Sequence, residues 1–155
     1  MPPITVVIAD QDKRRRAHFL HILQPEKGKG ISVVGVARSG LEAMMAAARL
    51  KPRILLLNLN LIKRKRNNLL PALRQNSPRT KVILLTDHGA GAAILEGLSH
   101  GAWGYLNEGG INAFLPKAVR LVDAGEAWVP RKMVAKIVER RASLMANEEG
   151  KPYWT

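Results

Sequence analysis

Polar residues stand at or near the ends of the apolar segments of this chain, and their types could support binding or chemistry. In open α/β sheets, ligands and reacting groups lie beyond the carboxyl ends of the strands. If the apolar segments are parallel strands, these polar residues therefore converge on one edge of the sheet. The amide of Asn58 has no anionic oxygen, so we do not expect a nucleophile at that position. The set consists of Asp10, Gln11, Asn58, Thr86, Tyr105 and Glu108.

The segment that positions this set is the apolar run before Asn58. Four consecutive large apolar residues, Ile54–Leu57, follow Pro52 and are closed by polar residues. A short, uninterrupted apolar run is typical of a strand that is buried on both faces, as in the centre of a parallel sheet. We therefore expect a central strand that delivers Asn58 to the functional edge.

The remaining segments alternate between strand-like and helix-like patterns. Runs at 4–9, 31–37, 81–86 and 101–106 join the central run as predicted strands, and helical spacing occurs at 14–23, 41–50, 68–75, 92–98 and 111–122. Ser39 is a predicted N-cap, with Glu42 in the first turn of its helix. Parallel neighbours need helical crossovers, so the pattern predicts an α/β fold with a doubly wound, five-stranded parallel sheet.

Composition limits the class of protein. With 155 residues, of which 46% are hydrophobic, the chain can form one packed domain and a short appendage. It has no cysteine, which excludes disulfides and thiolate metal sites. His18 and His21 share a predicted helix face but lack carboxylates at ligand spacing, so we expect surface residues. No apolar run approaches the roughly 20 residues of a membrane span, and we expect a cytoplasmic protein without a membrane partner.

Two enzyme motifs are incomplete in this chain. Gly89-Ala90-Gly91 falls between a predicted strand and a predicted helix, but Ile94 stands where a dinucleotide fingerprint has its third glycine. No serine is set in a nucleophile elbow. The sequence therefore gives no support to an enzyme.

The net charge of +13 is unusual, and part of it is clustered. Two basic runs follow the first and third predicted strands, so both are expected near the same edge of the sheet as Asn58. Such a rim could bind a polyanion such as nucleic acid or an anionic metabolite, or it could be a solvated surface. Its cations could also pair with Asp10, Asp12 and Glu108. The runs are Lys13, Arg14, Arg15 and Arg16, and Lys63, Arg64, Lys65 and Arg66.

Several motifs together resemble the receiver domain of bacterial two-component response regulators of the NarL/LuxR type. The resemblance covers roughly residues 4–140 and implies the flavodoxin-like receiver fold with strand order 2-1-3-4-5 and a C-terminal linker helix. The motifs are Val6–Asp10, Val33–Ala37 followed by Ser39–Ala43, Lys51-Pro52 ahead of Asn58, Leu84–Thr86 and Gly101–Leu106.

The resemblance also implies roles for the residues at the functional edge. Receivers hold Mg²⁺ with two adjacent acids after the first strand and an aspartate ending the third, and that aspartate accepts the phosphoryl group. This chain has Asp10 with Gln11, and Asn58 at the acceptor position. Glu108 stands where the family has a lysine, whereas Thr86 and Tyr105 match the switch pair. We therefore expect no aspartyl phosphorylation and weak or lost Mg²⁺ binding, because one carboxylate remains and nearby cations oppose a divalent ion.

The C-terminal part resembles the linker of the same regulators. We expect a receiver domain at 1–126, a linker helix at 131–144 and an interdomain linker at 146–150, within a second segment at 127–155. The resemblance implies a DNA-binding domain next, which this chain does not contain. The predicted function is an atypical receiver that regulates transcription as a homodimer, with a sensor kinase or another regulatory protein as a possible partner. A stand-alone interaction module, or anion binding by the basic rim, remain as alternatives.

Overall fold

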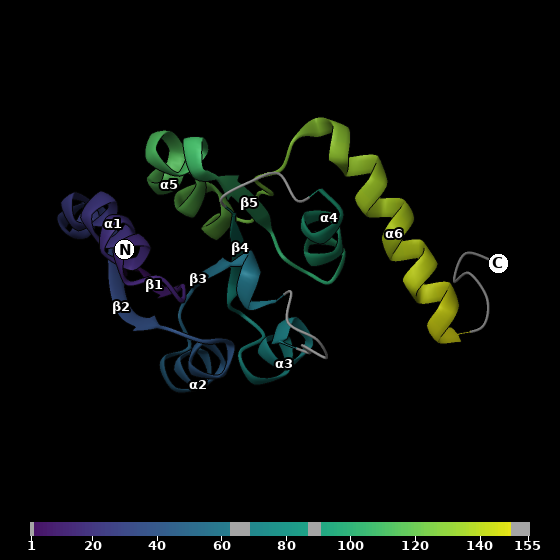
Figure 1. Ribbon diagram of the computed structural model, residues 1–155, viewed down its shortest axis with the longest axis horizontal. Helices are drawn as coiled ribbons and strands as arrows, with labels where there is room; N and C mark the ends of the chain where they lie inside the picture. Colours follow the sequence, from purple (N-terminus) through teal and green to yellow (C-terminus); the bar gives the residue numbers. More distant parts are fainter. Residues whose placement is uncertain (1, 63–68, 87–90, 150–155) are drawn as a thin grey trace.

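A single parallel sheet forms the centre of the protein (Figure 1). The computed structural model describes residues 2–62, 69–86 and 91–149. The sheet has the order β2-β1-β3-β4-β5, and every pair of neighbours is parallel. The predicted fold class and strand order are therefore confirmed. The strands are β1 (Ile4–Ala9), β2 (Ile31–Ala37), β3 (Ile54–Asn58), β4 (Lys81–Thr86) and β5 (Gly104–Asn107).

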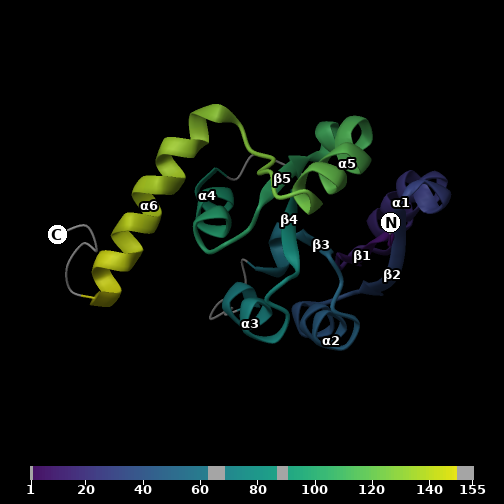
Figure 2. The same ribbon diagram turned by 180° about the vertical axis from the view of Figure 1, so that it is seen from behind.

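Helices cover both faces of the sheet. On one face lie α1 (Lys13–Leu23) and α5 (Glu108–Asp123), and on the other lie α2 (Gly40–Leu50), α3 (Leu69–Asn76) and α4 (Gly91–Ser99). The last helix, α6 (Arg131–Glu149), lies outside the sheet beside α4, as both views show (Figures 1 and 2). Two short 3₁₀ helices, η1 (Gln24–Lys29) and η2 (Leu59–Leu61), follow α1 and β3.

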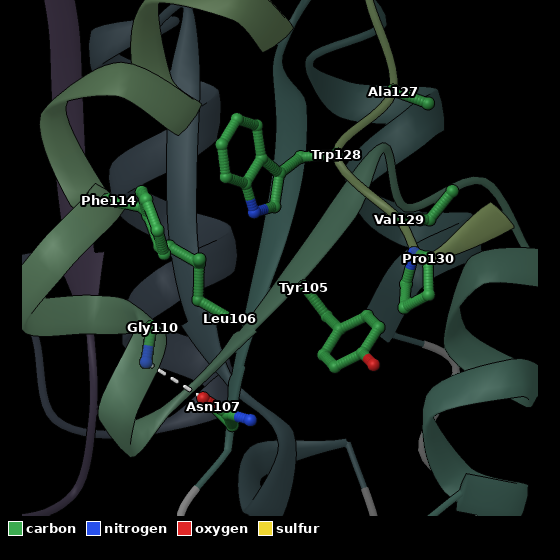
Figure 3. Close-up of a pocket in the computed structure, with 9 residues that line it drawn as sticks. All are labelled: Tyr105, Leu106, Asn107, Gly110, Phe114, Ala127, Trp128, Val129 and Pro130. Atoms are coloured by element: carbon green, nitrogen blue, oxygen red, sulfur yellow. Dashed lines mark hydrogen bonds between the residues drawn. The ribbon is translucent and has the colours of Figure 1, made fainter.

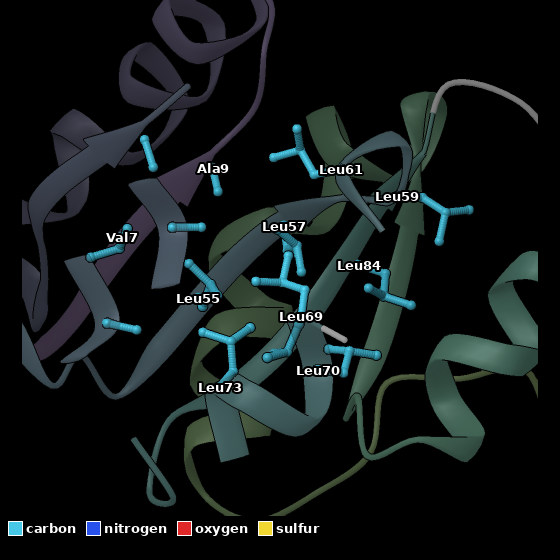
Figure 4. Close-up of a cluster of buried hydrophobic side chains, with 14 of the residues drawn as sticks. Val7, Ala9, Leu55, Leu57, Leu59, Leu61, Leu69, Leu70, Leu73 and Leu84 are labelled. Carbon is cyan, nitrogen blue, oxygen red and sulfur yellow. The ribbon is translucent and has the colours of Figure 1, made fainter. Parts of the chain in front are cut away.

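The central strand separates two hydrophobic clusters. All five residues of β3 are buried, as its apolar run predicted. Leu55 and Leu57 face α2 and α3 (Figure 4). Ile54 and Leu56 face α1 and α5. Successive side chains of a strand point to opposite faces, so an uninterrupted apolar run can bury both faces of the sheet. This double burial fixes where β3 ends and therefore where Asn58 lies.

The start of α2 is capped from both directions. The Ser39 hydroxyl accepts a hydrogen bond from the Glu42 N–H at 3.1 Å, which confirms the predicted N-cap. The Glu42 carboxylate in turn accepts from the backbone N–H of Arg38 at 2.9 Å and pairs with the Arg38 guanidinium. These contacts hold the pKa of Glu42 below its usual value, chiefly through the backbone N–H of Arg38.

The structure corrects two predicted boundaries. β5 begins at Gly104 and not at 101, because Gly101 has a φ of 112° and lies in the turn that closes α4. The predicted linker helix at 131–144 is too short, since α6 continues to Glu149, into the segment predicted as an interdomain linker. Gly150 and the rest of the tail lie outside the described residues, as do Gly89 and Ala90. No described helix is long and apolar enough to cross a membrane.

Candidate functional site

Asp10 is a buried carboxylate at the edge where the strands end, which we call the carboxyl edge. It directly follows β1, and its side chain is fully buried. One carboxylate oxygen, Oδ1, accepts from the backbone N–H of Asp12 at 2.8 Å. The other, Oδ2, accepts from Arg15 Nε and from Asn58 Nδ2, each at 2.8 Å. Three donors therefore surround one negative charge that is shielded from water.

Asn58 ties β3 to β1 through this carboxylate. The residue is 1% exposed, and its two side-chain atoms have separate partners. Nδ2 donates to Asp10, and Oδ1 accepts from the backbone N–H of Asn60 at 2.8 Å, which caps η2. An amide can make both bonds because it carries a donor and an acceptor, whereas an ionised carboxylate carries only acceptors. Both the donor and the acceptor of the Asn58 amide are therefore used by the local structure.

The first turn of α1 supplies the cation of the site. Arg15 forms an ion pair with Asp10 and also lies over the Phe19 ring, 5.6 Å from its centroid. Arg16 Nη1 donates to the Asp10 backbone oxygen at 2.8 Å. The sequence predicted that the basic run could pair with Asp10, and the structure confirms this for Arg15. Two of the four cations at 13–16 are therefore directed inward, while the basic run at 63–66 lies outside the described residues.

The other two substituted positions, Gln11 and Glu108, are exposed. Glu108 begins α5, where a carboxylate is favoured by the helix dipole. It also lines a hollow of about 210 Å³ together with Arg14 and His18. His18 Nε2 lies 2.6 Å from Asn112 Oδ1, which links α1 to α5. Within the described ranges, no group of three or more His, Cys, Asp or Glu residues could hold a metal ion.

The two residues that match the switch pair lie on adjacent strands. Thr86 is 5% exposed and ends β4, where it pairs in register with Asn107 of β5. Tyr105 lies on β5 opposite Leu84 and is half-buried. Its ring faces a pocket of about 390 Å³ that Phe114, Trp128 and Pro130 also line (Figure 3). The carboxyl edge thus brings Asp10, Asn58 and Thr86 to the ends of neighbouring strands.

A strand-like strap along β5 was missed by the sequence reasoning. Trp128 forms a parallel β-bridge with Gly104. The Trp128 N–H donates to the Trp103 carbonyl at 3.0 Å, and the Tyr105 N–H donates to the Trp128 carbonyl at 3.1 Å. A Cβ atom on Gly104 would lie 2.8 Å from the Trp128 carbonyl oxygen, so the close approach needs glycine. The run 127–129, defined here as the strap, is too short to show a strand period.

Comparison with known proteins gives a consistent family. A family model described as the response regulator receiver domain matches residues 6–120. The transcriptional regulatory protein LnrK of Bacillus subtilis (strain 168) is 28% identical over 135 residues, which cover 87% of this chain and 60% of that protein. The chain therefore spans about 60% of the length of this curated relative.

Solved structures show the same fold. The isolated receiver domain of RcsB from Salmonella enterica serovar Typhimurium, determined with the phosphomimetic BeF₃⁻, superimposes with a TM-score of 0.71 at 20% identity. The match covers 87% of this chain and 98% of the RcsB chain. A structure of two RcsB dimers bound to two parallel DNAs matches with a TM-score of 0.72 at 21% identity, over 88% of this chain and 68% of that one.

Proposed function

Because this chain belongs to the response regulator receiver domain family, with transcription-regulator relatives of the NarL/LuxR type, we propose that it is a receiver that signals without aspartyl phosphorylation. The observation that carries the proposal is the bond from Asn58 Nδ2 to Asp10 Oδ2. The amide occupies the acceptor position at the end of β3, and it is used as a hydrogen-bond donor. An amide cannot provide the anionic oxygen that attacks a phosphoryl donor.

The charge balance around Asp10 supports a site that is complete without phosphate. Arg15 contributes a positive charge at 2.8 Å, and Asn58 contributes a neutral donor in place of a second carboxylate. Two adjacent carboxylates would repel each other and would need a cation between them. Here only one carboxylate is present, and the Arg15 guanidinium balances its charge.

The same donors argue against Mg²⁺ at this edge. Magnesium needs near-octahedral coordination by hard oxygens, usually from one or two carboxylates and several waters. Both Asp10 oxygens already accept hydrogen bonds, and the Asn58 oxygen accepts from Asn60. A divalent cation would also lie against the Arg15 guanidinium. The residues present do not fit the ion, and we propose that Mg²⁺ binding is weak or lost.

The output is proposed to be transcription regulation through a homodimer, with a receiver unit at 1–126 and the linker helix after it. The strap joins the switch residue Tyr105 directly to the chain that leads into α6. Contacts of α6 with α4 include the ion pair between Arg140 and Glu96 at 2.6 Å. Through these contacts, a change at the carboxyl edge could alter the position of the linker helix α6. A non-catalytic role follows from the same reasoning, since the family's chemistry uses the missing acids.

The proposal is tested by labelling with acetyl phosphate in the presence of Mg²⁺, followed by sedimentation with and without beryllofluoride. We expect no label and no change of sedimentation in the natural chain. The matched comparison is the triple variant Asn58→Asp, Gln11→Asp and Glu108→Lys, which restores the family's residues and is expected to respond. Stable, Mg²⁺-dependent labelling of the natural chain would refute the proposal.

A further inference from the structure

A second charged feature lies at the opposite edge of the sheet, where the strands begin. Two hollows of about 940 and 230 Å³ adjoin there, because Pro78 and Trp103 line both of them. We call the combined feature the basic furrow. Asp123 is the one carboxylate among the described residues that line it. Its cations are Lys51, Arg53, Arg74, Arg79, Lys81 and Arg141.

Three of these cations are held by backbone carbonyls and form no ion pair with a carboxylate of the described residues. Lys51 Nζ donates to the Asn76 carbonyl at 2.6 Å, Arg74 donates to the His100 carbonyl, and Arg141 Nε donates to the Ser99 carbonyl at 3.4 Å. A backbone carbonyl orients a cationic side chain, but it carries no net charge to cancel the cation's own. These side chains have therefore already lost part of their rotamer freedom in the free protein. Ordering them on a ligand then costs less conformational entropy.

The remaining cations divide into paired and available groups. Arg53 makes a bidentate ion pair with Asp123 at 2.7 and 3.0 Å, so this pair contributes little net charge. Lys81 lies over the Trp103 ring, 4.8 Å from its centroid, and keeps its charge. Arg79 is exposed. The furrow thus keeps an excess of positive charge in a concave surface, where field lines from several cations reinforce each other.

We propose that the basic furrow binds the phosphate backbone of double-stranded DNA independently of base sequence. Stacking with unpaired bases is disfavoured, because Lys81 covers one face of Trp103 and the ring is half-buried. A membrane surface is disfavoured because none of the large exposed hydrophobic side chains of the described residues lines the furrow. Contact by Lys and Arg with phosphates needs neither feature.

This DNA contact is distinct from the carboxyl edge. The furrow is built from the segments before β3 and β5, the start of β4 with the residues before it, and side chains of α3, α5 and α6. Asp10 and Asn58 lie at the other edge, where strands end. The two features can therefore be tested by separate variants. The inference does not depend on how the receiver is switched, and failure of either proposal leaves the other unchanged.

The test compares two charge-matched double variants of the 155-residue chain. Lys51→Gln with Arg79→Gln removes one Lys and one Arg from the furrow, and Lys13→Gln with Arg14→Gln removes the same pair of types from the rim at the carboxyl edge. Binding to a fluorescent mixed-sequence duplex of about 20 base pairs is followed by anisotropy between about 50 and 200 mM NaCl. Both variants carry the same net charge, so long-range attraction is equal. Thermal unfolding confirms that each is folded.

We expect the furrow variant to lose DNA affinity by about tenfold or more at about 50 mM salt, and the slope of log K against log salt to become shallower by about two. The rim variant is expected to keep the slope of the natural chain. Equal losses in both variants, a loss in the rim variant alone, or no binding by the natural chain would overturn the proposal. Binding to vesicles of anionic lipid without binding to the duplex would also overturn it.

Discussion

Replacing Asn58 with aspartate is the most direct perturbation of the carboxyl edge. The change removes the donor that contacts Asp10 Oδ2 at 2.8 Å and places a second carboxyl at the same position. The site is 1% exposed, so water cannot screen the new contact. In the natural chain a neutral amide faces the Asp10 carboxylate. In the variant, two carboxyl groups face each other.

The size of the effect has a lower and an upper bound. A hydrogen bond to a charged group contributes about 1.5–3 kcal/mol, which sets the lower end. Repulsion between the introduced carboxylate and Asp10 sets the upper end. If this repulsion became larger than the free energy needed to protonate the new carboxyl, the carboxyl would take up a proton. For an aspartate of ordinary pKa at about pH 7, that free energy is about 4 kcal/mol. The neutral acid can then donate to Asp10 as the amide does. We therefore expect Asn58→Asp to lower the free energy of unfolding by about 2–4 kcal/mol at about pH 7.

Urea unfolding followed by tryptophan fluorescence measures this loss, and thermal unfolding is expected to show a fall of about 4–16 °C in Tm. Since Asp10 raises the folded-state pKa of the introduced carboxyl, the folded state binds more protons and the deficit shrinks as the pH falls. Asn58→Ala is the control, because it removes the same donor without adding a charge and should show no such pH dependence. An aspartate variant as stable as the natural chain at about pH 7, or a deficit that does not change with pH, would refute the reasoning.

Other perturbations test the remaining parts of the structure. Arg15→Ala is expected to lower the free energy of unfolding by about 3 kcal/mol in urea, because it leaves a buried carboxylate without its cation; a loss near zero would contradict the role given to the ion pair. Gly104→Ala is expected to cost about 1–3 kcal/mol, because its new Cβ would lie 2.8 Å from the Trp128 carbonyl oxygen. Unchanged amide-exchange protection at Trp128 would contradict that reason. Glu42 has a lowered pKa through the Arg38 N–H, so its contribution to stability is present above its unfolded-state pKa and is lost as the pH falls through the folded value. The natural chain and Glu42→Gln are therefore expected to differ at neutral pH and to converge in acid, as acid titration of unfolding would show.

Much of the fold could be predicted because its signals are local. The buried run of β3 and the N-cap at Ser39 depend on neighbouring residues, and both are found as expected. The start of β5 is different, because the conformation of Gly101 depends on how α4 closes and not on the strand pattern. The strap was missed for a similar reason, since it has no periodicity and forms only when β5 offers an open edge to Trp128.

The sequence predicted which residues lie at the candidate site, but not which hydrogen bonds and ion pairs they form. Strand-end topology brought Asp10 and Asn58 to one edge, as expected. The sequence indicated only that nearby cations could pair with Asp10. Which of them does so depends on the start of α1, because the Asp12 N-cap places Arg15 on the turn that faces the carboxylate. Helix phase decides this assignment, and composition cannot.

The strap determines how a structural change in the sheet could reach α6. A flexible linker would let the segment after β5 move freely, and the sheet could then change only the effective concentration of whatever follows. Two hydrogen bonds, one to Trp103 just before β5 and one from Tyr105 within it, hold Trp128 in register, and α6 begins three residues later at Arg131. For the proposed receiver function, we infer that a rotation of β5 changes the direction of α6. A flexible linker of the same length would not transmit such a change of direction.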